Sequence, residues 1–281
     1  MRNSSKINLN ESRESTLKEV LLAVDECCIE LGIDFYILGA LARDVWFTEK
    51  GIPASGTKDV DFAVFLSETE QFSQLKERLM QKHEFVTVKG NEFVLLAPNK
   101  MQIDVLPFGK LEVEDGVTVK GEGLTKIKVN GFKEVYLQSV MDAYVLEGKK
   151  FKVATLPGIF LLKLIAFDDR PDQRQNDPVD CLSIIENFFE LQSDLIYDYH
   201  NDLFGDDRPL EQISARVIGR EMRKPLSENS DLKVRITEIL KDHVKLKEKS
   251  SFILQMASYA YLATEDCTLY LGEVLNGIQD V

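Results

Sequence analysis

The pattern of apolar residues changes character near residue 155, and this change limits the folds open to the chain more than any other feature. Before it, helical and strand patterns alternate: apolar residues recur three or four apart over 17–31, whereas 35–38 and 59–66 have the short patterns of strands. After it, only helical patterns follow, over 158–168, 179–192, 209–224, 230–242, 250–263 and 268–279. We therefore expect an α+β domain with a mixed sheet over 10–155 and a helical domain over 156–281.

Local signals set the limits of the expected elements in the first domain. Gly32 is a candidate C-cap, and Gly39 separates the strand 35–38 from a helix over 40–47. Residues 48–58 are rich in Gly, Pro and Ser, which is typical of a loop. Further signals follow along the chain: a capping box at 67–70 opening a helix, a hairpin formed by 92–97 and 101–106, and an Asn130-Gly131 turn among strands that extend to about 155.

Composition narrows the class of protein. The chain has 281 residues with 34 Lys and Arg against 47 Asp and Glu, a net charge of −13, so nucleic-acid binding over its whole surface is excluded. We see no secretory signal, and the apolar stretch 158–167 is too short to span a bilayer, so we expect a cytoplasmic protein. The four cysteines lack zinc-site spacing, which predicts reduced, mostly buried thiols and no disulfide framework.

Three aspartates are candidate metal ligands. Asp59 and Asp61 are two apart on an expected strand, so both carboxylates project from one face about 7 Å apart. Asp104 lies on a later strand, opposite its core-facing neighbours, and three carboxylates converge if the two strands pair. Such a set suits a two-metal site for Mg²⁺ or Mn²⁺ with phosphate oxygens, whereas isolated aspartates are more often solvated or capping.

The turn at Gly39 is a candidate phosphate-binding element. A buried strand, a glycine and a helix leave backbone amides that can approach a triphosphate, which makes Gly39 and Ala40 candidate nucleotide contacts. Arg43 could contact the same triphosphate or form a salt bridge with Asp44.

Lys163 is the one polar residue in the apolar helix 159–167. A helix that is apolar all round is normally buried, and a lysine is almost never buried unpaired. Its ammonium therefore either reaches solvent along its stem or faces a cleft, where it holds nucleotide phosphates or pairs with a carboxylate.

The segments 37–44 and 57–62, with the later Asp104, resemble the hallmark of the polymerase-beta-like nucleotidyltransferases over residues 35–107. The turn 39–44 is similar to that of tRNA nucleotidyltransferases and poly(A) polymerases. This sequence departs from the usual pattern at Ala40, where a serine hydroxyl for the γ-phosphate is absent.

The segment 156–170, with Arg174–Asp177 and Asp180, resembles the downstream motif of the AbiEii-type nucleotidyltransferases, which include toxins of toxin-antitoxin pairs. The resemblance implies an active-site lysine, Lys163, and an acid, Asp177 or Asp180. Asp177-Pro178 also fits the start of a helix, so we expect Asp177 to be the N-cap and Asp180 the functional acid.

Arg216, Arg220 and Arg223 share one face of an expected helix. A solvated face is the common explanation for such a stripe, and a contact with an RNA backbone is the functional one.

These features predict metal-dependent transfer of a nucleotide from an NTP to an acceptor. From the resemblance we expect RNA, in particular a tRNA 3′ end, as the acceptor, a toxin-like role and an antitoxin protein as a possible partner. Two alternatives stay open: an enzyme that modifies a small molecule such as an antibiotic, and a catalytically inactive nucleotide-binding regulatory module.

Overall fold

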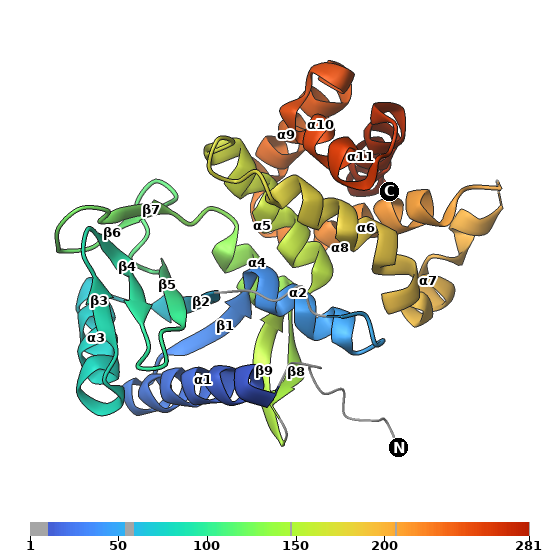
Figure 1. Cartoon of the computed structure of the whole chain (residues 1–281). Helices are drawn as coiled ribbons and strands as arrows, with labels where there is room; N and C mark the ends of the chain where they lie inside the picture. The colour runs from blue at the N-terminus through green and yellow to red at the C-terminus, as the bar shows by residue number, and fades with distance from the viewer. Residues whose placement is uncertain (1–10, 54–58, 147, 206, 281) are drawn as a thin grey trace. The chain divides into compact units, whose positions relative to one another are not determined.

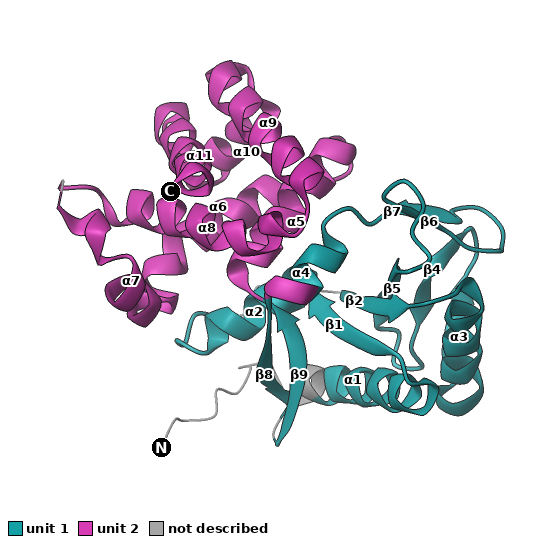
Figure 2. Cartoon of the chain, turned by 180° about the vertical axis from the view of Figure 1, so that it is seen from behind, with its two compact units in different colours: residues 1–136, 140–154 teal, residues 137–139, 155–281 magenta. Residues whose placement is uncertain are grey.

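The chain forms two compact units in a computed structural model that describes residues 11–53, 59–146, 148–205 and 207–280, with side chains from residue 15 onward (Figure 2). The α+β unit comprises Met1–Tyr136 and Val140–Ala154, and the helical unit comprises Leu137–Ser139 and Thr155–Val281. The α+β class with a mixed sheet and a helical C-terminal region, expected from the sequence, is confirmed.

A seven-stranded sheet in the order β3-β4-β5-β2-β1-β9-β8 organises the α+β unit (Figure 1). Its central strand β2 runs antiparallel to β1 and parallel to β5, and a separate hairpin pairs β6 with β7. The strands are β1 (Asp34–Leu38), β2 (Asp59–Leu66), β3 (Val86–Val88), β4 (Asn91–Leu96), β5 (Gln102–Gly109), β6 (Gly116–Thr118), β7 (Lys126–Lys128), β8 (Val140–Leu146) and β9 (Lys149–Ala154).

The two faces of β2 have different surroundings. Val60, Phe62 and Val64 on one face are fully buried in the core. On the other face Phe65 stacks on Tyr136 of α4, whereas Asp59 and Asp61 are only half-buried. The alternation that predicted this strand therefore also separates a core face from a partly accessible acidic one.

The helices of the α+β unit are α1 (Glu11–Leu31), α2 (Gly39–Thr48), α3 (Thr69–His83) and most of α4 (Phe132–Gln138). Helices α1 and α3 pack against each other, and Arg78 and Lys82 of α3 form ion pairs with Glu30 of α1. The C-cap expected at Gly32 fits its positive φ of 63° directly after α1.

Two local predictions for this unit are wrong. The capping box lies one residue later than expected, with Glu68 as the N-cap and Gln71 closing it, because a glutamine serves the N3 position as well as an acid does. The Asn130-Gly131 turn leads into α4 and not into a hairpin. The predicted loop 48–58 overlaps the end of α2 at Thr48, and its residues 54–58 lie outside the described residues.

The helical unit contains all six helices predicted after residue 155, each displaced by a few residues at its ends. They are α5 (Leu156–Asp169), α6 (Asp177–Leu191), α8 (Leu210–Ser227), α9 (Ser230–Leu246), α10 (Ser251–Ala260) and α11 (Thr264–Gln279). Sequence reasoning missed α7 (Ser193–Tyr199) and the 3₁₀ segments η1 (Asn201–Phe204) and η2 (Lys247–Lys249), which are too short to show a period.

Burial agrees with the sequence in two further respects. From Leu156 to Ile165, every residue of α5 except Lys163 is buried. All four cysteines are buried free thiols, as expected. None of the helices in the described ranges combines the length and apolarity that a membrane crossing requires.

Candidate functional site

Strand pairing brings the predicted carboxylates together in the α+β unit. In the parallel β2–β5 pair, Asp61 is the register partner of Asp104, and Asp59 is the partner of Gln102. Adjacent strands lie about 4.8 Å apart, so the side chains of a register pair are neighbours on one face. All three aspartates are half-buried on this face; the pairing places Asp61 beside Asp104, whereas Asp59 lies two residues away along β2, beside Gln102.

Gly39 is in contact with Asp61. The glycine has a φ of 69°, and a Cβ atom placed on it would lie 2.0 Å from Asp61 Oδ2. Any side chain at this position would collide with the carboxylate, and an L-residue would also be strained by the positive φ. The Asp61 carboxylate therefore requires glycine at this position, and the approach of the turn to a triphosphate stays a prediction.

Helix α2 begins at this turn. Its N-cap residue, Leu38, provides no side-chain capping bond, and both Gly39 and Ala40 are half-buried. The first amides of a helix have no intrahelical partner and favour anions. Trp46 donates a 2.7 Å hydrogen bond from Nε1 to the carbonyl of Ala154, which holds the helix against β9.

Arg43 takes the second of the two roles considered for it. Its guanidinium binds Oδ1 of Asp44 at 3.0 Å, and both side chains are buried. It also lies 5.7 Å from the ring centroid of Phe47. A triphosphate would reach this arginine only if the buried pair rearranged.

Gln102 is a site residue that sequence reasoning missed. Its Nε2 donates a 2.9 Å hydrogen bond to Asp104 Oδ1, two residues along the same strand face. The signal was present, because a polar residue at i−2 from a predicted ligand shares its face. Gln102 therefore restricts the orientation of the Asp104 carboxylate.

The donor set on this face suits Mg²⁺ or Mn²⁺. Mg²⁺ prefers one or two carboxylates completed by phosphate oxygens and water. In the described residues, no group of three or more His, Cys, Asp or Glu has the geometry of a ready-made metal cage. The paired Asp61 and Asp104 fit an ion whose remaining ligands come from a bound nucleotide.

Lys163 has two carboxylate partners within the helical unit. Its Nζ lies 2.9 Å from Asp177 Oδ1 and 2.6 Å from Asp180 Oδ2. Burial alone lowers the pKa of this ammonium, but the two carboxylates outweigh burial and the pKa is raised above its ordinary value. Of the alternatives considered, pairing with carboxylates is observed, and the lysine does not extend freely into solvent.

The prediction of Asp177 as the N-cap of α6 is wrong. The helix begins at Asp177, with Asn176 as the cap residue, and Oδ1 of Asp177 binds Lys163 instead of a backbone amide. Asp180 binds the same ammonium, so both acids that the resemblance left open belong to one cluster. Oδ2 of Asp177 is buried without a hydrogen-bond partner.

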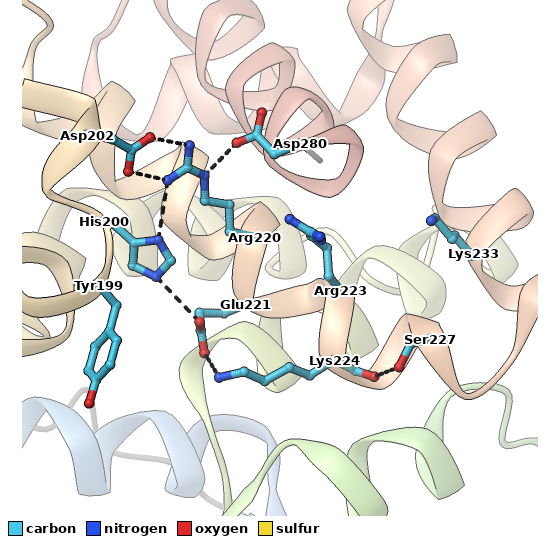
Figure 3. A pocket seen from close by; sticks show the side chains of 10 residues that line it. All are labelled: Tyr199, His200, Asp202, Arg220, Glu221, Arg223, Lys224, Ser227, Lys233 and Asp280. Atoms are coloured by element: carbon cyan, nitrogen blue, oxygen red, sulfur yellow. Dashed lines mark hydrogen bonds and ion pairs between the residues drawn. The ribbon is translucent and has the colours of Figure 1, made fainter. Parts of the chain in front are cut away.

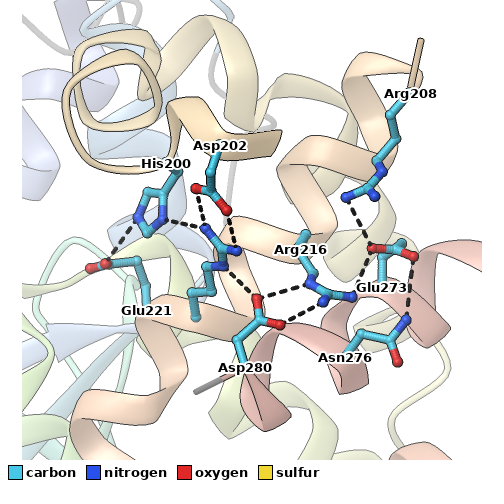
Figure 4. A network of polar contacts seen from close by, with 9 residues as sticks. His200, Asp202, Arg208, Arg216, Glu221, Glu273, Asn276 and Asp280 are labelled. Atoms are coloured by element: carbon cyan, nitrogen blue, oxygen red, sulfur yellow. Dashed lines mark hydrogen bonds and ion pairs between the residues drawn. The ribbon is translucent and has the colours of Figure 1, made fainter. Parts of the chain in front are cut away.

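We expected Arg216, Arg220 and Arg223 to form a free basic face on α8, and this prediction is wrong for Arg216 and Arg220. Asp280 binds Arg216 and Arg220, each at 2.5 Å, and Asp202 also binds Arg220 (Figure 4). Both guanidinium groups are half-buried. These arginines hold the C-terminal helix α11 in place, because Asp280 directly follows it; only Arg223 is exposed.

No protein-family model and no curated protein matches the sequence. Among solved structures, the chain is similar to the antibiotic-resistance factor ANT(2'')-Ia, with 14% identity and a TM-score of 0.40 over 69% of this chain and 97% of that one. It is also similar to an antigenic nucleotidyltransferase-like protein from Paracoccidioides brasiliensis, with 14% identity and a TM-score of 0.39 over 69% of this chain and 91% of that one. These values are too low to assign an activity, so the proposal below depends on the residues of this chain.

Proposed function

We propose that this protein is a metal-dependent nucleotidyltransferase. The observation that supports this function most is the register pair Asp61–Asp104, with Asp59 on the same face and the start of α2 in contact with Asp61. Carboxylates repel a triphosphate, whereas helix amides attract one. The two features are compatible when a divalent cation lies between the carboxylates and the phosphates.

In the proposed reaction, an acceptor hydroxyl attacks the α-phosphorus of an NTP. A new phosphorus–oxygen bond forms, the bond to the β-phosphate oxygen breaks, and pyrophosphate leaves with the electron pair. The proton of the hydroxyl passes to a carboxylate, for which we propose Asp104, oriented by Gln102. Asp59, Asp61 and Asp104 would hold Mg²⁺, which would neutralise charge on the phosphates.

Gly39 and Ala40 are proposed to approach the triphosphate through their backbone amides. The family resemblance also predicts active-site roles for Lys163 and Asp180, which lie in the helical unit. The toxin-like role and an antitoxin partner likewise stay predictions of that resemblance. An RNA acceptor also stays a prediction. Two of the three arginines expected to contact it, Arg216 and Arg220, form ion pairs with Asp280.

The proposal is tested by Mg²⁺-dependent binding of a non-hydrolysable NTP to the full chain and by pyrophosphate release with RNA, protein or an aminoglycoside as acceptor. We expect Asp61→Asn to weaken Mg²⁺-dependent NTP binding by more than about tenfold and to abolish transfer, because a ligating charge is lost while the shape is kept. The melting temperature without metal should stay the same or rise, because repulsion from Asp104 is relieved.

Asp142→Asn on the exposed outer strand β8 is the matched control, because it makes the same chemical change in the same sheet. It should change neither NTP binding nor pyrophosphate release. If Asp61→Asn keeps Mg²⁺-dependent NTP binding within about threefold of the wild type, the metal-site proposal is wrong.

A further inference from the structure

The helical unit contains an open pocket of about 680 Å³ beside α8 (Figure 3). A volume of this size suits a small organic molecule. The pocket is lined by polar and charged side chains of α7, η1, α8 and α9, by His200 between α7 and η1, and by Asp280 after α11: Tyr199, His200, Asp202, Arg220, Glu221, Arg223, Lys224, Ser227, Lys233 and Asp280.

One wall of the pocket is fixed by direct backbone contact between α8 and α11. A Cβ atom on Gly219 would lie 2.1 Å from a carbonyl oxygen of α11, and one on Gly277 would lie 2.1 Å from a carbonyl oxygen of α8. This close crossing brings Asp280 onto Arg220, at 2.5 Å. Arg220 also donates two 2.7 Å hydrogen bonds to Asp202, so its charge is satisfied within the protein.

A buried histidine links the remaining paired charges. His200 is 7% exposed, and its Nδ1 lies 3.5 Å from a guanidinium nitrogen of Arg220. A guanidinium only donates, so Nδ1 accepts, whereas Nε2 lies 3.4 Å from Glu221 Oε1 and is buried without a hydrogen-bond partner in the described part of the chain. Glu221 binds Lys224 at 2.5 Å. Of the three acidic residues of the lining, Asp202 and Asp280 therefore bind Arg220, and Glu221 binds Lys224.

Arg223 and Lys233 differ from these residues. They line the same pocket from α8 and α9, both are exposed, and neither has a hydrogen-bond or ion-pair partner for its side chain among the described residues (Figure 3). The lining has four cations and three carboxylates, a local excess of positive charge in a chain with a net charge of −13, and this excess attracts an anion. A phosphate monoester offers both Arg223 and Lys233 negatively charged oxygens at pH 7.

We propose that this pocket binds a small phosphorylated molecule, with its phosphoryl group held between Arg223 and Lys233. Arginine offers a two-pronged donor to phosphate oxygens and lysine a mobile point charge. This inference does not depend on the proposed nucleotidyl transfer.

A long nucleic acid fits these observations less well than a small ligand. Binding along a nucleic-acid backbone requires a row of uncommitted cations, and Arg216 and Arg220 on the same helix are already neutralised by Asp280. The two remaining cations satisfy a single phosphoryl group.

The test is calorimetric titration of the full chain with phenyl phosphate, phenol and inorganic phosphate, in low salt with EDTA so that no divalent cation is bound elsewhere. We expect phenyl phosphate to bind and phenol not to bind. The double variant Arg223→Gln/Lys233→Gln should weaken phenyl phosphate binding by about tenfold or more, because both charges that face the phosphoryl group are lost.

The matched control is Lys241→Gln/Lys245→Gln, which removes two exposed charges from α9 outside the pocket lining. It should retain the affinity of the wild type, and all variants should retain its melting temperature. The inference fails if phenyl phosphate does not bind at about 10 mM, or if the two double variants bind it equally well. It also fails if a single-stranded RNA binds through Arg223 and Lys233 and phenyl phosphate does not compete.

Discussion

Gly39 is the residue at which backbone conformation and the candidate chemistry are coupled most directly. Its φ of 69° and its contact with Asp61 mean that an added methyl group has two separate effects. The positive φ strains any L-residue, and the methyl group displaces the carboxylate. These effects can be separated, because Gly32 has a similar φ of 63° with no atom within 4 Å of its would-be Cβ.

We expect Gly39→Ala and Gly32→Ala to lower the free energy of unfolding by similar amounts, about 1 kcal/mol or somewhat more, because both introduce the same backbone strain. Only Gly39→Ala should abolish Mg²⁺-dependent NTP binding, because Asp61 must rotate away from the methyl group. The measurements are chemical denaturation and equilibrium NTP binding for both variants. Equal NTP binding in the two variants would show that the position of the Asp61 carboxylate does not matter.

For single residues, the sequence predicted which strand face a side chain occupies, but it did not predict which other side chains that residue contacts. Alternation placed Asp59 and Asp61 on one face, and the structure pairs Asp61 with Asp104 as anticipated. The salt bridge of Arg43 with Asp44 and the hydrogen bond from Gln102 to Asp104 depend on side-chain rotamers, which no periodicity encodes.

Between elements, the Lys163 cluster joins α5 to α6 inside the helical unit. Asp177 is buried, and the side chains of Lys163 and Asp180 are 12% and 18% exposed. Removing one partner of a buried ion pair leaves an uncompensated charge and typically costs more than the pair itself contributes.

We expect Lys163→Met to lower the free energy of unfolding by about 3–5 kcal/mol, because two carboxylates then lie in a buried site without a cation. Adding Asp177→Asn and Asp180→Asn to Lys163→Met should restore much of this loss. Lys245→Met on the exposed surface of α9 is the control and should change stability by less than about 0.5 kcal/mol. The measurement is denaturant unfolding of the wild type, Lys163→Met, the triple variant and Lys245→Met. If Lys163→Met alone has a mild effect, the cluster is well hydrated.

The ion pairs of Lys163 also make the free energy of unfolding depend on pH in the alkaline range. The folded-state pKa of Lys163 is raised above its ordinary value of 10.5, so the stabilisation is complete below pH 10.5 and is lost as pH rises through the folded-state pKa. On the alkaline side, the stability difference between the wild type and Lys163→Met should therefore begin to shrink only above pH 10.5, as denaturant unfolding at increasing pH would measure.

The elements that sequence reasoning predicted poorly share a physical cause. A seven-residue helix such as α4 or α7 spans only two turns, and the Asn-Gly turn before α4 suits a hairpin as well as a helix start. The basic stripe on α8 was visible, but the acids that neutralise it come from Asp202 and Asp280, distant in sequence. Tertiary ion pairs of this kind leave no local signal.

At the scale of the whole molecule, the excess of acidic residues makes stability depend on pH in two opposite ways. Burial raises the pKa of Glu112 and of Glu186, so their ionised forms oppose folding. For Asp280, burial alone raises the pKa, but Arg216 and Arg220 outweigh burial and the pKa is lowered. A carboxyl group with a raised pKa favours folding as pH falls, and one with a lowered pKa favours folding only while it stays ionised.

We therefore expect the free energy of unfolding to rise as pH falls from 7 toward 4.5 and to decrease below about 3.8, the ordinary values for Glu and Asp. Glu186→Gln should be more stable than the wild type at pH 7, with a difference that vanishes as pH falls below 4.5, because the wild-type carboxyl is then neutral in both states. Asp280→Asn should be less stable at pH 7, and its difference from the wild type should close only below pH 3.8. Urea unfolding across pH 3–7 measures both differences. If the Glu186→Gln difference stays constant over this range, the rise in wild-type stability comes from the falling net charge of −13 and not from the buried glutamates.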